Sequence, residues 1–185
     1  MTRIAGAVLA AGAGSRMGSP KAELVVDGAR LVDRAVLVLR EAGCHPLFAV
    51  VRAGTSVPGA QAIVNPAPQR GQRSSLALAV AAAGDVDALA VLLVDAPGVG
   101  SAAVAATVSA WTPGRIATAC YAARRGHPIV MAPQLWRAAL ELAGPDEGAR
   151  ALLRARAELV DEVAVAGDPT DLDTPDDVER WQARP

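Results

Sequence analysis

Short runs of aliphatic residues alternate along the chain with longer stretches of helical periodicity. Six runs are nearly continuous and rich in Val, Ile and Leu, as expected for strands buried on both faces, at residues 4–10, 47–51, 62–64, 88–94, 116–122 and 129–132. A weaker run covers 159–165. Helical spacing predicts helices over 31–41, 74–83, 101–111, 134–142 and 148–156, and a last helix that begins near Thr174.

Strands that alternate with helices predict an α/β fold. We expect residues 1–185 to form a single-domain, Rossmann-like, doubly wound structure, with a mostly parallel sheet and helices on both faces. Ligands in such folds bind outside the carboxyl ends of the strands. The segments that follow strands, where functional residues are expected, are 11–21, 65–75, 95–98 and 171–173.

Composition excludes several classes of protein. Apolar residues make up 52% of the chain, and 18 Lys and Arg nearly balance 19 Asp and Glu, so neither disorder nor a nucleic-acid partner is indicated. The apolar runs are shorter than the ~18–20 residues of a membrane span, which argues against a membrane protein. Two cysteines, Cys44 and Cys120, form no disulfide framework or metal-binding pattern. These features predict a cytoplasmic protein.

A glycine-rich loop follows the first predicted strand. Residues 9–21 read Leu-Ala-Ala-Gly-Ala-Gly-Ser-Arg-Met-Gly-Ser-Pro-Lys, which is neither a Walker A loop nor, with Gly12, Gly14 and Gly18, the dinucleotide fingerprint. Glycines allow backbone amides to approach phosphate oxygens, and the loop also carries the cations Arg16 and Lys21. The loop is therefore interpreted as a phosphate cradle, with a flexible surface loop as the alternative.

Carboxylates follow two of the predicted strands. Asp95 ends the run 88–94, where it could hold Mg²⁺ together with substrate phosphates or simply stabilise a turn. Asp171 and Asp173 precede Thr174, and either could bind metal or cap the last helix.

Ser74 and Ser75 are expected to open the helix 74–83, where they would bind an anion or a base edge, or act as plain caps.

The glycine-rich loop resembles the signature of the molybdenum-cofactor nucleotidyltransferases. It is also similar, more broadly, to sugar-phosphate and methylerythritol cytidylyltransferases. Further segments match the cytidylyltransferase branch in chain order, at residues 65–66, 71–76, 93–99, 126–129, 148–153 and 171–175. The resemblance covers nearly the whole chain and implies a fold of the nucleotide-diphospho-sugar transferase type.

The resemblance implies roles for particular residues. It assigns catalysis to Arg16 and Lys21, Mg²⁺ binding to Asp95 and Asp173, and acceptor binding to His127 and Arg124. The residues implied in nucleotide binding are Leu9, Ala10, Ala11, Gly12, Ala13, Gly14, Ser15, Asn65, Gly71, Gln72, Ser74 and Ser75.

The implied reaction transfers CMP from CTP to the terminal phosphate of molybdopterin and releases pyrophosphate. CTP is favoured because the loop reads Leu-Ala-Ala-Gly, with Ala11 where guanylyltransferases of the family have Gly. The Ala11 methyl is expected to narrow the base pocket, which a pyrimidine tolerates better than a larger purine. A GTP-dependent guanylyltransferase, or transfer to another phosphorylated acceptor, is the alternative within this class. Ala96 also stands where many relatives have Gln, which weakens the identification of the acceptor. Transient contact with a molybdoenzyme or a chaperone is a further expectation.

Two other classes of protein fit the sequence less well. A short-chain nicotinamide oxidoreductase requires a Tyr followed four residues later by Lys, but Tyr121 is followed at that spacing by Arg125. A catalytically silent binding protein with the same fold would not require Arg16, Lys21 and Asp95 together. Nucleotidyl transfer is therefore the favoured function.

Overall fold

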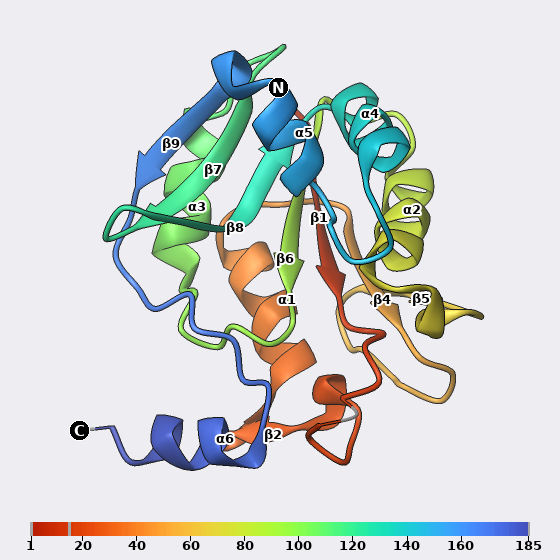
Figure 1. Cartoon of the computed structure of the whole chain (residues 1–185), viewed down its shortest axis with the longest axis vertical. Helices are drawn as coiled ribbons and strands as arrows, with labels where there is room; N and C mark the ends of the chain where they lie inside the picture. Colours follow the sequence, from red (N-terminus) through yellow and green to blue (C-terminus); the bar gives the residue numbers. More distant parts are fainter. Residues whose placement is uncertain (1, 15, 185) are drawn as a thin grey trace.

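A seven-stranded sheet forms the centre of the computed structural model, which describes residues 2–14 and 16–184 (Figure 1). The strand order is β5-β4-β1-β6-β8-β7-β9. The strands of this sheet are β1 (Ile4–Leu9), β4 (Leu47–Val51), β5 (Gln61–Val64), β6 (Ala88–Leu93), β7 (Ile116–Tyr121), β8 (Arg124–Met131) and β9 (Val160–Ala164). The α-helices are α1 (Leu31–Glu41), α2 (Gln72–Ala83), α3 (Ser101–Ala110), α4 (Pro133–Leu142), α5 (Arg150–Ala155) and α6 (Pro175–Gln182).

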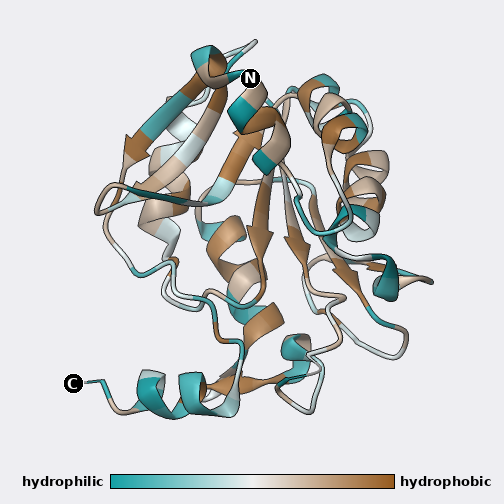
Figure 2. Cartoon of the chain, viewed as in Figure 1, coloured by the Kyte–Doolittle hydropathy of each residue, from teal (hydrophilic) through white to brown (hydrophobic). Residues whose placement is uncertain are grey.

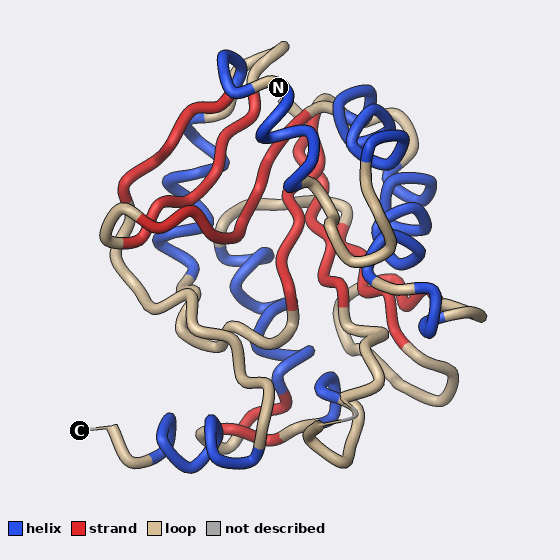
Figure 3. The backbone as a smooth tube through the Cα atoms, in the orientation of Figure 1, coloured by secondary structure: helices blue, strands red, loops and turns tan. Residues whose placement is uncertain are grey.

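The sheet is mostly parallel, as the alternation of strands and helices predicted. β5, β4, β1 and β6 pair in parallel, and β9 pairs in parallel with β7. β8 lies between β6 and β7 and is antiparallel to both. The four adjacent parallel strands therefore bring their carboxyl ends to one edge of the sheet, where the loops after them gather (Figure 3).

Helices cover both faces of the sheet, which also confirms the predicted architecture. Successive residues of β1 point to opposite faces, so Val8 joins one apolar cluster and Leu9 the other. The first cluster includes buried residues of α1 and α3, and the second includes buried residues of α2, α4 and α5. Figure 2 shows the central strands as the most hydrophobic part of the chain. This burial on both faces explains the continuous apolar runs in the sequence.

The structure corrects two sequence-based boundaries and contains one element that was not predicted. The strand expected at 129–132 begins already at Arg124, because polar residues and the Gly-His-Pro segment hide its first half from a hydrophobicity pattern. The helix expected at 74–83 begins at Gln72, since Gly71 lies in the left-handed region at φ 83° and ends the preceding turn. A small antiparallel sheet of β2 (Val25–Val26) and β3 (Ala29–Arg30) was not predicted, because two-residue strands leave no readable pattern.

The last helix begins where expected and lies outside the main sheet. Thr174 is its N-cap, and its side chain and that of Asp177 form a reciprocal capping box. Figures 1 and 2 show α6 as a largely hydrophilic helix beside β2. The Trp181 indole Nε1 donates to Asp27 Oδ2 at 3.0 Å, which ties this helix to the turn between β2 and β3. Across the described part of the chain, every helix is too short or too polar to span a membrane.

Candidate active site

The glycine-rich loop leaves the carboxyl end of β1 and turns back on itself at Gly14. The backbone amides of Met17 and Gly18 donate to the Gly14 carbonyl oxygen at 2.8 and 2.9 Å. Gly14 has φ 58°, and a Cβ there would lie 2.0 Å from the Ser19 carbonyl oxygen, so only glycine fits this turn. Ser15, one of the residues implied in nucleotide binding, lies outside the described residues.

Lys21 joins the two carboxylates that were expected to bind metal. Its Nζ donates to Asp95 Oδ2 at 2.7 Å and to Asp173 Oδ1 at 2.5 Å. A guanidinium nitrogen of Arg16 lies 3.6 Å from Asp173 Oδ2. Four side chains from three separate segments of the sequence therefore meet at the carboxyl edge of the sheet. Lys21 is also the only lysine in the chain, a signal that composition alone could have supplied.

The backbone holds the two carboxylates in place. Asp95 follows β6 directly, and its carbonyl oxygen accepts a hydrogen bond from the Leu172 amide at 2.8 Å, which fixes the segment that carries Asp173 against the end of β6. Asp177 Oδ2 accepts from the amides of Asp173 and Thr174 at 3.0 and 2.8 Å. The first turn of α6 therefore orients Asp173 as well as capping the helix.

The cluster keeps Lys21 and Asp173 charged. Burial by itself lowers the pKa of the Lys21 ammonium, but the charges of Asp95 and Asp173 and the hydrogen bonds to them outweigh it, so the pKa lies above its ordinary value. The hydrogen bond from Lys21 holds the pKa of Asp173 below its ordinary value. A cation is thus fixed beside two carboxylates at neutral pH.

A pocket of about 570 Å³ opens between the glycine-rich loop and the start of α2. Its lining includes predicted nucleotide-binding residues, namely Leu9, Gly12, Ala13, Gly71, Gln72 and Ser75, together with Arg16, Lys21, Asp95 and Asp173. A Cβ on Gly12 would have no atom within 4 Å, so the space above this residue is open for a ligand. We call this the nucleotide pocket.

Ala10 and Ala11 lie beside this pocket without lining it. Both side chains are buried, that of Ala10 in the apolar cluster of one face and that of Ala11 in the cluster of the other. The expectation that the Ala11 methyl narrows the base pocket directly is therefore corrected. The methyl packs in an apolar cluster of the core, so any effect on the pocket must pass through the backbone of the loop.

Asn65 fixes the two serines at the start of α2. Its side-chain amide donates to Ser74 Oγ at 2.9 Å and to Ser75 Oγ at 3.0 Å, and its Oδ1 accepts from the Ala67 amide at 2.9 Å. Ser74 Oγ in turn donates to the Gly71 carbonyl oxygen at 2.8 Å. Because the helix begins at Gln72, neither serine is its N-cap, and Gly71 occupies that position. Ser75 alone of these three lines the nucleotide pocket.

A second pocket, of about 590 Å³, lies on the other side of Asp173. It contains both residues expected to bind the acceptor, Arg124 and His127, and it shares Leu93 and Asp173 with the nucleotide pocket. Asp171 also lines this second pocket, whereas it does not line the first. We call it the acceptor-side pocket.

Two arginines of the acceptor-side pocket, Arg150 and Arg154, were not assigned to any site from the sequence. Both belong to α5. Arg150 lies in the segment 148–153 that carries part of the family resemblance, so this motif could have located it, whereas Arg154 follows the segment. Arg154 pairs with Glu147 at 2.8 Å, and Arg125, on β8, pairs with Glu162 at 2.5 Å. Arg124 and Arg150 form no ion pair among the described residues, so these two guanidiniums are the groups of this pocket that can contact an anionic ligand.

A bulge in β8 places His127 at this pocket. β7 and β8 pair at Thr118↔Ile129 and then at Ala119↔Gly126, so His127 and Pro128 have no opposite residue on β7. Such bulges re-aim side chains and are common next to active sites. The Tyr121 hydroxyl donates to the His127 carbonyl oxygen at 2.7 Å and holds the bulge. The strand expected at 129–132 would have left His127 outside it, whereas the structure places His127 within β8.

His127 is expected to make the stability of the protein depend on pH. Burial lowers its pKa to about 4, so between this value and the unfolded value of 6.5 the unfolded chain binds more protons than the folded chain. The stabilisation by the neutral imidazole is complete above about pH 6.5 and is lost as the pH falls toward 4. Between pH 7 and 4.5, the free energy of unfolding measured with denaturant should fall less in His127→Gln than in wild type. The difference between the two slopes against pH should correspond to less than one bound proton.

The pH dependence of wild type alone does not isolate His127, because Asp171 changes the stability with pH in the opposite direction. Burial, and then the charge of Asp95, raise the pKa of Asp171 to about 6, so its contribution is lost as the pH rises through that value. His45→Gln is a matched control, since His45 is the other histidine, is exposed, and also precedes a proline. Equal pH slopes for wild type and His127→Gln would contradict the prediction.

The carboxylate cluster is suited to a divalent cation. Asp95 Oδ1 is buried and has no hydrogen-bond partner in the described structure, although a buried carboxylate oxygen normally has one. Mg²⁺ is commonly held by one or two carboxylates together with substrate phosphates, so it does not require a larger cluster of protein ligands. Residues 2–14 and 16–184 contain no group of three or more His, Cys, Asp or Glu that could form one. Asp95 and Asp173 fit this type of site.

Comparison with known proteins identifies relatives along the whole chain. Nicotine blue oxidoreductase of Paenarthrobacter nicotinovorans is 35% identical over 188 residues, which cover 92% of each chain. A probable molybdenum cofactor guanylyltransferase of Opitutus terrae is 42% identical over 105 residues. That match covers 54% of this chain and 51% of the relative, so it spans about half of each protein.

The solved structures that resemble this fold and the family profile that matches the sequence lead to the same conclusion. The crystal structure of Rv0371c from Mycobacterium tuberculosis superposes with a TM-score of 0.85 and 28% identity over 99% of both chains. A complex of Rv0371c with manganese has 27% identity and a TM-score of 0.79 over 98% of both chains. The family profile described as the MobA-like NTP transferase domain matches residues 6–163. The chain therefore belongs to the MobA-like NTP transferase family and is a nucleotidyltransferase of this type.

Proposed function

We propose that the protein transfers a nucleoside monophosphate, with CMP from CTP favoured, to the terminal phosphate of a molybdopterin-type acceptor. The observation that carries this proposal is the junction of two pockets at Asp173, with Lys21 between Asp95 and Asp173. One pocket offers a glycine-rich loop for a triphosphate, and the other offers arginines for an anionic acceptor. A transfer reaction requires this side-by-side placement of donor and acceptor.

In the proposed reaction, an oxygen of the acceptor phosphate attacks the α-phosphorus of the triphosphate. The bond from the α-phosphorus to the bridging oxygen breaks, and pyrophosphate leaves. Such transfers depend mainly on alignment and charge neutralisation, with little acid–base chemistry. Lys21 and Arg16 would neutralise the phosphate oxygens on the donor side, and Arg124 would hold the acceptor phosphate. Mg²⁺, held by Asp95 and Asp173, would supply further neutralisation of phosphate charge when bound.

The identity of the base is the finer part of the proposal. The loop sequence Leu-Ala-Ala-Gly supports CTP through its resemblance to cytidylyltransferases, whereas the name of the Opitutus terrae relative supports GTP. The decisive experiment measures pyrophosphate release with each of the four nucleoside triphosphates, with and without molybdopterin. Release that depends on both CTP and molybdopterin supports the proposal. A preference for GTP would replace CMP transfer by GMP transfer in the proposal. If no triphosphate leads to release of pyrophosphate, the proposal is contradicted.

Ala11→Gly is expected to lower the preference for CTP over GTP by about tenfold. A difference of one methyl group is worth ~10–200-fold in discrimination, and the buried methyl of Ala11 acts only through the loop backbone, so the low end of this range applies. The measurement is the ratio of kcat/KM for the two nucleotides. Ala10→Gly is the matched control, because Ala10 is equally buried but packs on the opposite face. An unchanged ratio in Ala11→Gly would remove Ala11 as a determinant of base choice.

An oxidoreductase is the second candidate, because the relative with 92% coverage of both chains carries that name. Tyr121, the tyrosine considered for such a role, is buried and donates its hydroxyl to the His127 carbonyl oxygen. Burial also raises its pKa to about 12, so it is poorly placed to transfer a proton. Oxidation of NADH or NADPH with a redox dye as acceptor tests this candidate. Turnover in this assay without any release of pyrophosphate would favour it over nucleotidyl transfer.

A further inference from the structure

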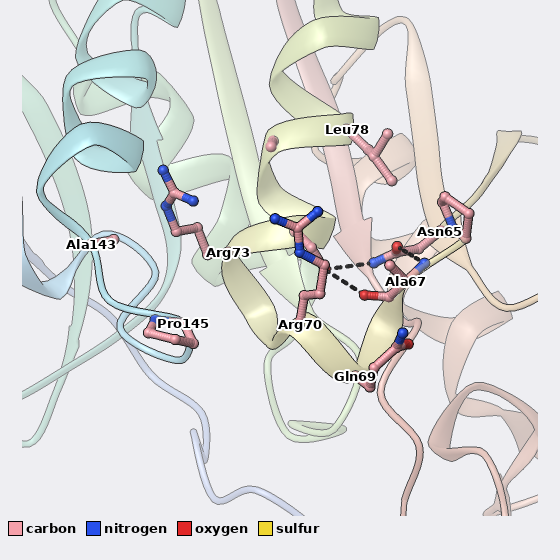
Figure 4. Close-up of a pocket in the computed structure, with 11 residues that line it drawn as sticks. Asn65, Ala67, Gln69, Arg70, Arg73, Leu78, Ala143 and Pro145 are labelled. Atoms are coloured by element: carbon pink, nitrogen blue, oxygen red, sulfur yellow. Dashed lines mark hydrogen bonds between the residues drawn. The ribbon is translucent and has the colours of Figure 1, made fainter.

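A third pocket, of about 680 Å³, lies outside both the nucleotide pocket and the acceptor-side pocket. It is formed by the segment after β5, the exposed side of α2 and the turn that follows α4 (Figure 4). Gln69 and Pro145 line both this pocket and the nucleotide pocket, so the two are neighbours. None of Arg16, Lys21, Asp95 and Asp173 contributes to it. Asn65 and Ser74, which the family resemblance implied in nucleotide binding, line this third pocket and not the nucleotide pocket. The groups proposed to act on the phosphates therefore lie outside it.

Arg70 and Arg73 give the pocket a net positive charge. They are its only ionisable lining residues, and neither forms an ion pair with a carboxylate in the described part of the chain. Figure 4 shows Arg73 in the first turn of α2 and Arg70 in the turn that precedes this helix. Arg73 Nε donates to the Leu140 carbonyl oxygen at 2.8 Å, which fixes the guanidinium while its two terminal nitrogens stay available. Two guanidiniums match a doubly charged phosphate monoester better than a singly charged carboxylate.

The rest of the wall is largely apolar. The apolar lining residues are Pro66, Ala67, Ala77, Leu78, Ala143 and Pro145. Such a combination of apolar walls and a few polar groups is characteristic of small-molecule sites rather than of a site for an inorganic ion alone. The charge would hold a phosphate, and the walls would cover a ring or another flat apolar group.

We propose that this pocket binds an organic phosphate with a flat apolar part, at a site distinct from the catalytic centre. Hydrogen bonds connect this site to the nucleotide pocket. The Arg73 amide donates to the Pro145 carbonyl oxygen at 2.9 Å, and Asn65 holds Ser74 in this pocket together with Ser75 in the nucleotide pocket. A ligand here touches the residues that shape the neighbouring site. The proposal does not depend on which reaction the enzyme catalyses.

The test is direct binding of phenyl phosphate, measured by calorimetry, with inorganic phosphate as the probe that lacks a ring. Wild type should bind phenyl phosphate saturably and at least several-fold more tightly than inorganic phosphate. Arg70→Ala should weaken binding about tenfold, and Arg70→Ala with Arg73→Ala about 100-fold, as expected for charge-assisted hydrogen bonds. Lys21→Ala, which alters the nucleotide pocket, should bind like wild type. Arg156→Ala, which removes an exposed arginine elsewhere, is the matched control.

Several results would overturn the proposal. The first is the absence of saturable binding by wild type. The second is binding that is lost in Lys21→Ala but kept in Arg70→Ala, because this result would place the phosphate in the catalytic centre. Equal affinity for the two probes would exclude a ligand with an apolar part. Arg70→Ala keeps the test valid even if Arg73→Ala disturbs the fold, because the Arg70 side chain makes no hydrogen bond or ion pair in the structure as described.

Discussion

Replacing Lys21 by alanine is expected to lower kcat by about 10²–10³-fold, or roughly 3–4 kcal/mol, the usual cost of removing one preorganised charge donor. Lys21 is held beside Asp95 and Asp173 before any substrate arrives, so no reorganisation is required to present its charge to the phosphates. Charge on the phosphate oxygens increases in the transition state. The KM for the nucleoside triphosphate should therefore change far less than kcat.

Pyrophosphate release under saturating triphosphate measures this effect. Arg16→Ala is the matched comparison: its side chain is 72% exposed and lies 3.6 Å from Asp173, so a smaller loss is expected. Since Lys21 is the only lysine, chemical modification of its amine and protection by the triphosphate give an independent readout of occupancy. A variant with unchanged kcat and only a raised KM would show that Lys21 binds substrate and transition state equally, against the role proposed here.

The main elements of the fold could be predicted because the sheet is buried on both faces. Each of the strands β1, β4 and β6 is therefore a continuous run of apolar residues in the sequence. The first half of β8 could not be read in this way. It contains Arg124, Arg125 and the unpaired residues of the bulge, whose conformation depends on contacts with Tyr121 and β7 rather than on local pattern.

Lys21, Asp95 and Asp173 could be anticipated as neighbours from one topological rule. Residues that follow parallel strands gather at one edge of the sheet, and these positions follow or adjoin strand ends. The rule does not give pairwise contacts, so the bridging of both carboxylates by Lys21 required the structure. It also does not distinguish Asp171 from Asp173. The structure separates them, because Asp173 contacts Lys21 and lines both pockets, whereas Asp171 lines only the acceptor-side pocket.

The hydrogen bonds from Asn65 to Ser74 and Ser75 could not be predicted from the sequence either, because they are pairwise contacts. Asn65 was assigned to nucleotide binding, but it is buried, and its side chain is occupied by Ser74, Ser75 and the Ala67 amide. A residue with these contacts can orient Ser75 toward a ligand without lining the pocket itself. Side-chain hydrogen bonds between segments ten residues apart leave no periodic signal in a sequence.

The second large effect is expected for Asp95→Asn, which should abolish most activity at saturating triphosphate. Asparagine keeps nearly the same size but removes the negative charge that a hard divalent cation requires. The buried Oδ1 of Asp95 has no hydrogen-bond partner, so it is available to such a cation. Of the two carboxylate oxygens of Asp95, only Oδ2 accepts a hydrogen bond from Lys21, and an asparagine carbonyl oxygen at this position can still accept that bond. The fold should therefore change little, while excess Mg²⁺ or Mn²⁺ should restore at most part of the activity.

The experiment measures pyrophosphate release against metal concentration, with thermal unfolding of each variant as the check on folding. Asp85→Asn is the matched control, because Asp85 is exposed after α2 and distant in sequence from the cluster. Asp173→Asn should raise the metal requirement in the same way but less severely, since its carboxylate is more exposed than that of Asp95 and is also neutralised by Arg16. If Asp95→Asn keeps wild-type activity and an unchanged metal requirement, Asp95 serves only the turn before Pro97. In that case the role of Lys21 would have to be explained by direct contact with the triphosphate alone.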